Sequence, residues 1–250
     1  MIRAIAAREF RSLVVSPLSW LVLAVVQFVL AYVFLASLDV FIEAQPRLAG
    51  LENAPGITEI VIMPLFGSMA VVLLLIVPII TMRTFSDERR NGTWTLLVTA
   101  PVTVTEIVIG KFCGVLGFFF ILIALLILMP VSLLVAGSVD LGHLGASTLA
   151  ITLLTASFTA IGLFASSLYA HPAAAAISSF GVLLMLWIVD WRAGAASGDI
   201  MSYISMLRHY HVLLAGQVSS VDIVYFLLVI ALALSLSIWR LDAEKWWSAR

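Results

Sequence analysis

The residues best suited to chemistry in this chain lie in a polar segment, residues 83–111, between two long uncharged stretches. This segment carries a cluster of acidic and basic side chains, which are suited to charge-assisted hydrogen bonds with another protein. It ends on Gly110-Lys111, but a phosphate-binding loop needs the pattern G-x-x-x-x-G-K-[ST]. Here Thr105 stands at the first glycine position and Phe112 follows the lysine. We therefore expect a contact surface in this segment and no ATP hydrolysis by this chain alone.

The histidine and cysteine side chains do not form a convincing metal site. His209 and His211 could each ligate a metal, but residues two apart on a helix do not face each other. No cysteine or third ligand lies near them in the sequence to complete a set. We expect them to be polar anchors at a membrane interface and Cys113 to be a packing residue, so the predicted metal ligands are none.

An intramembrane hydrolase is an enzymatic alternative, and it would need a nucleophile with a base, or paired aspartates, inside the spans. The serines that could serve have no G-x-S-x-G pattern and no intramembrane aspartate pair beside them: Ser166, Ser167, Ser178 and Ser179. The sequence therefore argues against an enzyme, and no catalytic residue is predicted.

The elements that position the polar segment are membrane spans. With 63% hydrophobic residues, 11% charged residues and a mean hydropathy of +1.16, the chain is far more apolar than soluble proteins. We predict an all-α membrane domain covering residues 1–250, with a turn at Tyr169-Ala170-His171-Pro172 where proline interrupts a long uncharged stretch. Six spans are expected, at residues 19–38, 60–82, 107–136, 143–169, 172–190 and 222–240.

Basic residues predict the orientation of these spans. They gather before span one, in the polar segment and after span six, which places both termini and the polar segment in the cytoplasm. Residues 1–16 are predicted to form an interfacial helix that ends before Pro17, although Glu9 projects on its apolar side. The alternative is that its arginines only orient the first span. The loop of residues 39–59 is expected to be acidic, solvated and short of regular structure.

The polar segment has its own helix signals. Ser86 is expected to cap a short helix with acidic residues in its first turn, and Gly92 to end it. A second helix from Thr93 would run until Pro101 and present a mixed apolar and charged surface, and Thr103 with Glu106 has capping-box spacing at the start of span three. We interpret this surface as a docking site for another protein; the alternative is a loop resting on lipid headgroups.

The segment ERRNGTWTLLVTAPVTVTEIVIGK resembles the cytoplasmic signature of ABC type-2 transporter permeases, and the six spans extend the resemblance to the whole chain. Within the family, the chain is most similar to the short permeases grouped with gliding-motility and nitrous-oxide-reductase maturation transporters. The resemblance assigns docking or coupling to an ATPase to Glu88, Arg89, Arg90, Gly92, Thr93, Trp94, Leu96, Leu97 and Pro101. It implies close helix packing or a dimer contact at Gly110, Gly114 and Gly117.

The same resemblance implies an ATP-driven exporter in the bacterial inner membrane. Its partners would be a separate ABC ATP-binding subunit that holds ATP and Mg, a second permease subunit that is identical or homologous, and an auxiliary periplasmic or membrane protein. No cofactor is expected on this chain and no nucleic acid partner, and residues 191–221 would form an external re-entrant segment. Two non-enzymatic alternatives stay open: a membrane scaffold that recruits an ATPase without transport, and an ion-coupled carrier. The carrier is disfavoured because Asp140, Asp190 and Asp222 all fall at predicted span ends.

Overall fold

The computed structural model describes residues 1–48, 56–92, 102–135, 140–188 and 204–248, and every regular element in these ranges is a helix. The all-α prediction is therefore confirmed for the described residues. The elements are α1 (Ile2–Val15), α2 (Pro17–Leu48), the π-helix η1 (Thr58–Ile62), α3 (Met63–Thr81), α4 (Arg83–Arg90), α6 (Val104–Ser132), the short 3₁₀ helix η2 (Leu133–Val135), α7 (Leu141–Leu168), α8 (Pro172–Ile188), α11 (Met206–Leu214) and α12 (Ser220–Ser248).

Five helical segments are long and apolar enough to cross a membrane: Pro17–Pro46, Thr58–Arg90, Val104–Ser132, Leu141–Leu168 and Ser220–Glu244. The remaining expected span, at residues 172–190, corresponds to α8, which is apolar but has only 17 described residues. At 1.5 Å per residue this is about 26 Å, slightly less than the roughly 30 Å of a hydrocarbon core. The count of six spans therefore stays a prediction.

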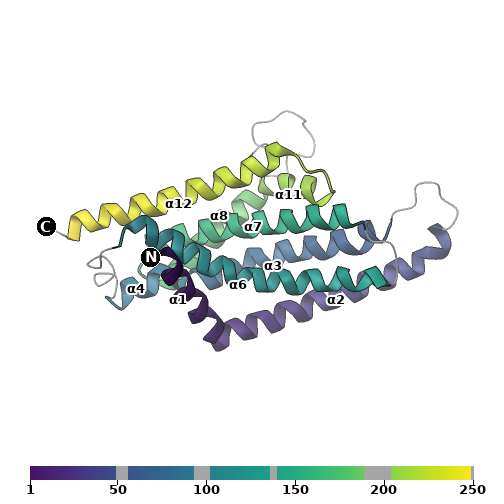
Figure 1. Ribbon diagram of the computed structural model, residues 1–250, viewed down its shortest axis with the longest axis horizontal. Helices are drawn as coiled ribbons and strands as arrows, with labels where there is room; N and C mark the ends of the chain where they lie inside the picture. Colours follow the sequence, from purple (N-terminus) through teal and green to yellow (C-terminus); the bar gives the residue numbers. More distant parts are fainter. Residues whose placement is uncertain (49–55, 93–101, 136–139, 189–203, 249–250) are drawn as a thin grey trace.

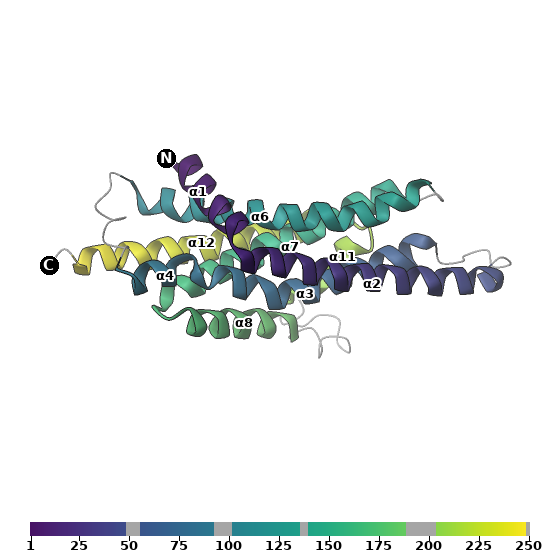
Figure 2. The same cartoon turned by 90° about the horizontal axis from the view of Figure 1, so that it is seen from below.

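The long helices lie side by side in an elongated bundle, with α7 at its centre (Figures 1 and 2). Helix α7 packs against α3, α6, α8, α11 and α12, and it is the most deeply buried of the five spans. Its small side chains permit this close packing. At Gly162 an added Cβ would lie 2.2 Å from Thr81 Oγ1, so α3 and α7 approach each other too closely there for any larger residue.

The two ends of the bundle differ in what they carry. One end, which we call the α4 end, holds the start of α1, all of α4 and the end of α12 (Figure 1). The opposite end, the α11 end, holds α11 and the starts of α7 and α12 (Figure 1). The first residues of the chain and α4 therefore share one end, as the predicted topology requires.

Several helix boundaries follow the predicted signals. Helix α1 ends at Val15 and α2 begins at Pro17, with Ser16 extended between them. The turn between α7 and α8 falls between Leu168 and Pro172. The capping box is confirmed, since the Thr103 side chain accepts from the Glu106 amide and the Glu106 carboxylate accepts from the Thr103 amide.

The loop predicted for residues 39–59 is wrong in its first part. Helix α2 continues ten residues past the predicted span end at residue 38 and includes Asp39 and Glu43. No glycine or proline interrupts residues 39–45, and a helix satisfies its own backbone hydrogen bonds whether lipid or water surrounds it. Charge therefore marks where the hydrocarbon region ends, but it does not mark where the helix ends.

Candidate functional site: the junction at α4

Helix α4 begins without a side-chain cap because the chain is already helical before it. The amide of Met82 donates to the Pro78 carbonyl, and Met82 has helical backbone angles. Ser86 consequently lies in the interior of α4, and the prediction that Ser86 caps this helix is wrong. Gly92 does end the helix, with a φ of 70° that suits glycine.

Ser86 instead takes part in a buried connection between α4 and α7. Ser166 Oγ on α7 accepts from the Phe85 amide at 3.0 Å and from the Ser86 amide at 3.2 Å, and it donates to the Met82 carbonyl at 3.0 Å. Ser86 Oγ donates to the Tyr169 carbonyl at 2.9 Å. One serine of α7 therefore bonds to two backbone amides and one backbone carbonyl where α4 begins. A hydroxyl engaged in this way is poorly placed to be a nucleophile, which adds to the case against a hydrolase.

Lys111 connects α4 to α6 and α1. Its Nζ donates to the Thr84 carbonyl at 2.6 Å and to Glu88 Oε1 at 2.8 Å, and it lies 3.6 Å from Glu9 Oε2. The ammonium also lies 4.9 Å from the centroid of the Phe85 ring. With its side chain only 3% exposed, Lys111 needs these partners to offset the loss of water.

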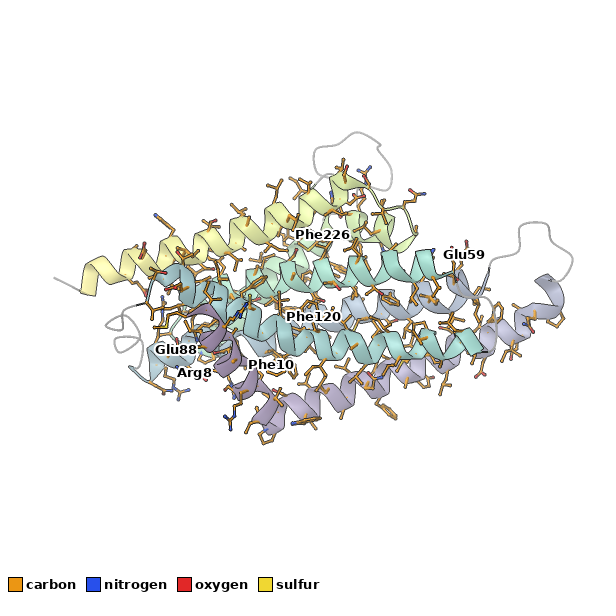
Figure 3. All side chains as sticks on the ribbon, viewed as in Figure 1. Arg8, Phe10, Glu59, Glu88, Phe120 and Phe226 are labelled. Atoms are coloured by element: carbon orange, nitrogen blue, oxygen red, sulfur yellow. The ribbon has the colours of Figure 1, made fainter. Side chains whose placement is uncertain are left out.

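Glu9 contributes the α1 side of this cluster. Burial raises the pKa of the Glu9 carboxyl, and the nearby Lys111 ammonium opposes that rise. The position of Glu9 on the apolar side of α1, which looked like a flaw in an amphipathic pattern, is explained by this buried cation. Figure 3 labels Glu88 on α4 and, on α1, Arg8 and Phe10, which lie on either side of Glu9 in the sequence.

Arg89 connects α4 to α12. Its guanidinium lies 2.5 Å from Glu244 Oε2, and Arg240 binds the other oxygen of the same carboxylate at 3.2 Å. The Arg89 and Glu244 side chains are 11% and 26% exposed, so water screens this pair only in part. Helix α4 is thus tied by polar contacts to α6, α7 and α12, and through Lys111 to α1. We call this arrangement the α4 junction, and it consists of Glu9, Thr84, Ser86, Glu88, Arg89, Lys111, Ser166 and Glu244.

Beside the α4 junction lies an open groove of about 610 Å³ between α4 and the turn that leads into α8. From α4 it receives Arg83, Asp87 and Arg90, and Asn91 follows at the helix end. The opposite wall includes His171 from the α7–α8 turn. Arg83 and Arg90 are exposed, so this groove presents both charge and hydrogen-bonding groups to a partner.

The residues predicted to dock an ATPase therefore fall into separate groups. Glu88 and Arg89 make ion pairs within the chain, whereas Arg90 is exposed in the groove. Gly92 lies just beyond the end of α4. The others lie outside the described residues: Thr93, Trp94, Leu96, Leu97 and Pro101.

The predicted glycine face of α6 is covered by α1. An added Cβ at Gly110 would lie 2.8 Å from Ile5 Cβ, and one at Gly114 would lie 2.7 Å from the Ala6 carbonyl oxygen. At Gly117 the nearest atom would be on the Phe10 ring, at 3.1 Å. These glycines thus let α1 cross α6 at close range. A dimer contact through the same atoms would require α1 to move away.

At the α11 end, His209 and His211 belong to no group of three or more potential metal ligands among the described residues. His209 Nδ1 lies 2.5 Å from Asp222 Oδ1, and its ring stacks on Tyr225 at a centroid distance of 4.1 Å. The neighbouring Tyr210 hydroxyl donates to the Phe66 carbonyl at 2.7 Å, and burial raises the Tyr210 pKa. His209 is therefore a buried packing residue that fixes α11 on α12, in contrast to the interfacial anchor that we expected.

A comparison with curated proteins gives no match. A family model described as "ABC-2 family transporter protein" matches residues 3–246. The match includes the whole α4 junction and all five segments able to cross a membrane. This chain therefore belongs to the ABC-2 transporter family and is a multi-pass membrane permease of an ABC transporter.

Proposed function

We propose that this chain is the permease subunit of an ATP-driven exporter, and that the α4 junction carries movement from a separate ATP-binding subunit into the spans. The supporting observation is that one short helix within the polar segment holds polar contacts to α6, α7 and α12. Family membership implies an ABC ATP-binding partner. ATP and Mg would be bound by that partner and not by this chain.

The distribution of basic residues supports a cytoplasmic α4 end and an inner-membrane location, with both termini in the cytoplasm. Within the described residues, the helices at the α11 end carry few basic residues, such as Arg208 on α11. The α4 end carries many more: Arg3, Arg8, Arg11, Arg83, Arg89, Arg90, Lys111 and Arg240. These basic residues oppose transfer of the α4 end across the membrane and so favour its retention in the cytoplasm.

The contacts in the α4 junction suit transmission because they are buried and come from several directions. If α4 alone moved, the Phe85 and Ser86 amides would lose Ser166, and Lys111 would be left buried beside fewer partners. Each loss costs about 1–3 kcal/mol for an unsatisfied buried group. A displacement of α4 therefore favours a joint displacement of α6, α7 and α12.

In this proposal Glu88 and Arg89 transmit force within the permease, and the groove beside them contributes to docking. Arg83 and Arg90 in the groove would pair with carboxylates of the ATP-binding subunit. The predicted helix between Thr93 and Pro101 would complete that contact. The exporter would work as a pair of permease subunits with two ATP-binding subunits, as its family resemblance implies.

Affinity purification of the tagged chain from native membranes in mild detergent tests the docking step. We expect wild type to recover a protein with Walker motifs and ATPase activity, and Arg83→Glu/Arg90→Glu to lose it while its melting temperature stays near wild type. Arg208→Glu, at the α11 end, is the charge-reversal control and should retain the ATPase. If no ATPase is recovered even after crosslinking, the proposal fails and an ion-coupled carrier becomes the better reading.

A further inference from the structure

Helix α1 has two chemically different faces. The face that packs on α6 includes Ile5, Ala6 and Phe10, which are partly buried there. The opposite face is exposed at positions three and four residues apart, and its members are Arg3, Ala7, Arg8, Arg11, Ser12 and Val15. Residues at this spacing form one continuous stripe along a helix.

The charged residues of the exposed stripe are all cationic because the one acidic residue of α1 faces the other way. Glu9 is drawn toward Lys111 on α6, at 3.6 Å. Arg8 and Arg11 are one turn apart, and with Ala7, Ser12 and Val15 they line an open depression of about 500 Å³. Ala7 and Ser12 contribute only small side chains to the lining of this depression.

Exposed apolar side chains continue from this depression along the start of α2. Val15 is 71% exposed and Leu21 is 62% exposed. Trp20 is also largely exposed, and its indole donates to the Val14 carbonyl at 2.7 Å. Tryptophan gathers at the level of lipid headgroups, so this indole marks where the apolar surface of α2 meets the basic face of α1.

We propose that the Arg8 and Arg11 face of α1 binds the phosphate headgroup of an anionic phospholipid in the leaflet at the α4 end. Guanidinium groups match phosphate oxygens in pairs, and Val15 with Leu21 would meet the acyl chains below. An acidic protein surface would pair with the arginines but would leave the adjoining exposed apolar residues without cover. A lipid satisfies both parts, and this inference does not depend on how the ATP-binding subunit docks.

The test measures lipid binding to the delipidated, purified full-length chain by native mass spectrometry. Phosphatidylglycerol and phosphatidylcholine with the same acyl chains are the probes. Each arginine near an anionic headgroup contributes about fivefold in affinity, which corresponds to about 1 kcal/mol. We expect wild type to prefer phosphatidylglycerol by at least about tenfold, and Arg8→Gln/Arg11→Gln to lose most of this preference without weaker binding of phosphatidylcholine.

Two control variants make the result specific. Arg8→Lys/Arg11→Lys keeps the charge and should keep most of the preference, while Arg83→Gln/Arg90→Gln removes two arginines elsewhere at the same end and should leave it unchanged. Equal binding of the two lipids by wild type would overturn the proposal. So would an unchanged preference in Arg8→Gln/Arg11→Gln, and loss of the ATPase from that variant with its lipid preference intact would assign this face to a protein partner.

Discussion

The Lys111 ammonium lies 2.8 Å from Glu88 Oε1, and this contact joins the start of one membrane span to the end of the helical segment that precedes it. Lys111 belongs to α6 and Glu88 belongs to α4. In the sequence, residues 93–101 lie between these two helices and outside the described residues. Any movement imposed on those residues from outside therefore acts on two helices that are already fixed to each other. This arrangement supports α4 and α6 moving as a unit.

Replacing Lys111 with Met removes an ammonium that lies 2.8 Å from Glu88 Oε1 and 3.6 Å from Glu9 Oε2. Two partly buried carboxylates then lose the cation that they share. We expect a loss of about 3 kcal/mol in stability, seen as a lower melting temperature in detergent by tryptophan fluorescence. The control Arg240→Gln removes a cation that is 38% exposed and should cost less than about 1 kcal/mol. Equal effects of the two substitutions would contradict a structural role for Lys111.

The Ser166→Ala variant tests the connection between α4 and α7. It leaves the Phe85 and Ser86 amides without their hydroxyl partner, which we expect to cost about 1–3 kcal/mol and to reduce ATPase stimulation in the assembled complex. Ser167→Ala is the matched control on the same helix. Its hydroxyl donates only to the Phe164 carbonyl, three residues back, so its loss should have little effect on either measurement. If the complex containing Ser166→Ala shows normal ATPase stimulation, the contact between Ser166 and α4 does not transmit movement to the spans.

A double-mutant cycle measures the pair between Arg89 and Glu244. Because the side chains are 11% and 26% exposed, we expect a coupling energy of about 1 kcal/mol, above that of a typical surface pair. The four proteins are wild type, Arg89→Ala, Glu244→Ala and the double variant, compared by melting temperature. Strictly additive losses would show that α12 is not held to α4 through this contact.

Gly114→Ala tests the close crossing of α1 over α6. The new methyl group would lie 2.7 Å from the Ala6 carbonyl oxygen and from Glu9 Cβ, and neither atom can rotate away. We expect a loss of about 1–3 kcal/mol as α1 shifts outward. Gly181→Ala on α8 has nothing within 4 Å of the added atom and should be neutral or stabilising by up to about 1 kcal/mol. Tolerance of Gly114→Ala would mean that α1 is not fixed on this face.

The raised pKa of Glu9 predicts a pH dependence of stability. Burial favours the protonated carboxyl in the folded state, so wild-type stability should fall as pH rises from the ordinary value of 4.5 through the higher folded pKa. Glu9→Gln carries no such titration, so at neutral pH it should be at least as stable as wild type. The difference in melting temperature should shrink as the pH is lowered toward 4.5. If Glu9→Gln were less stable than wild type by the same amount at every pH, the predicted pH dependence from Glu9 would be contradicted.

Local signals in the sequence predicted several features correctly, because each depends on neighbouring residues. The Thr103 and Glu106 capping box, the break before Pro17 and the end of α4 at Gly92 all follow from backbone chemistry within a few residues. Ser86 was misjudged for the opposite reason. Its role depends on Ser166, which is 80 residues away, and on a preceding helix that does not stop.

The contacts of the α4 junction could not be predicted from the sequence. The family resemblance assigns Glu88 and Arg89 to docking, which stays a prediction, and their partners within the chain are distant in the sequence. Arg89 and Glu244 are 155 residues apart, and only the packing of α4 against the end of α12 brings them together. One usable signal was Glu9, since a carboxylate on the apolar face of a helix requires a cation opposite it.

If nucleotide binding in the partner moves the spans through α4, a residue at the opposite end of the bundle should change its accessibility with nucleotide. In a Cys113→Ser background, a cysteine introduced at Gly142, at the exposed start of α7, is labelled with a membrane-impermeant maleimide in the assembled complex. We expect labelling rates to differ between the nucleotide-free and ATP-trapped states, and Ser166→Ala to reduce the difference. Equal rates in the two states, at this site and at a second cysteine at Ser219 before α12, would exclude this movement and favour a scaffold that binds an ATPase without moving its spans.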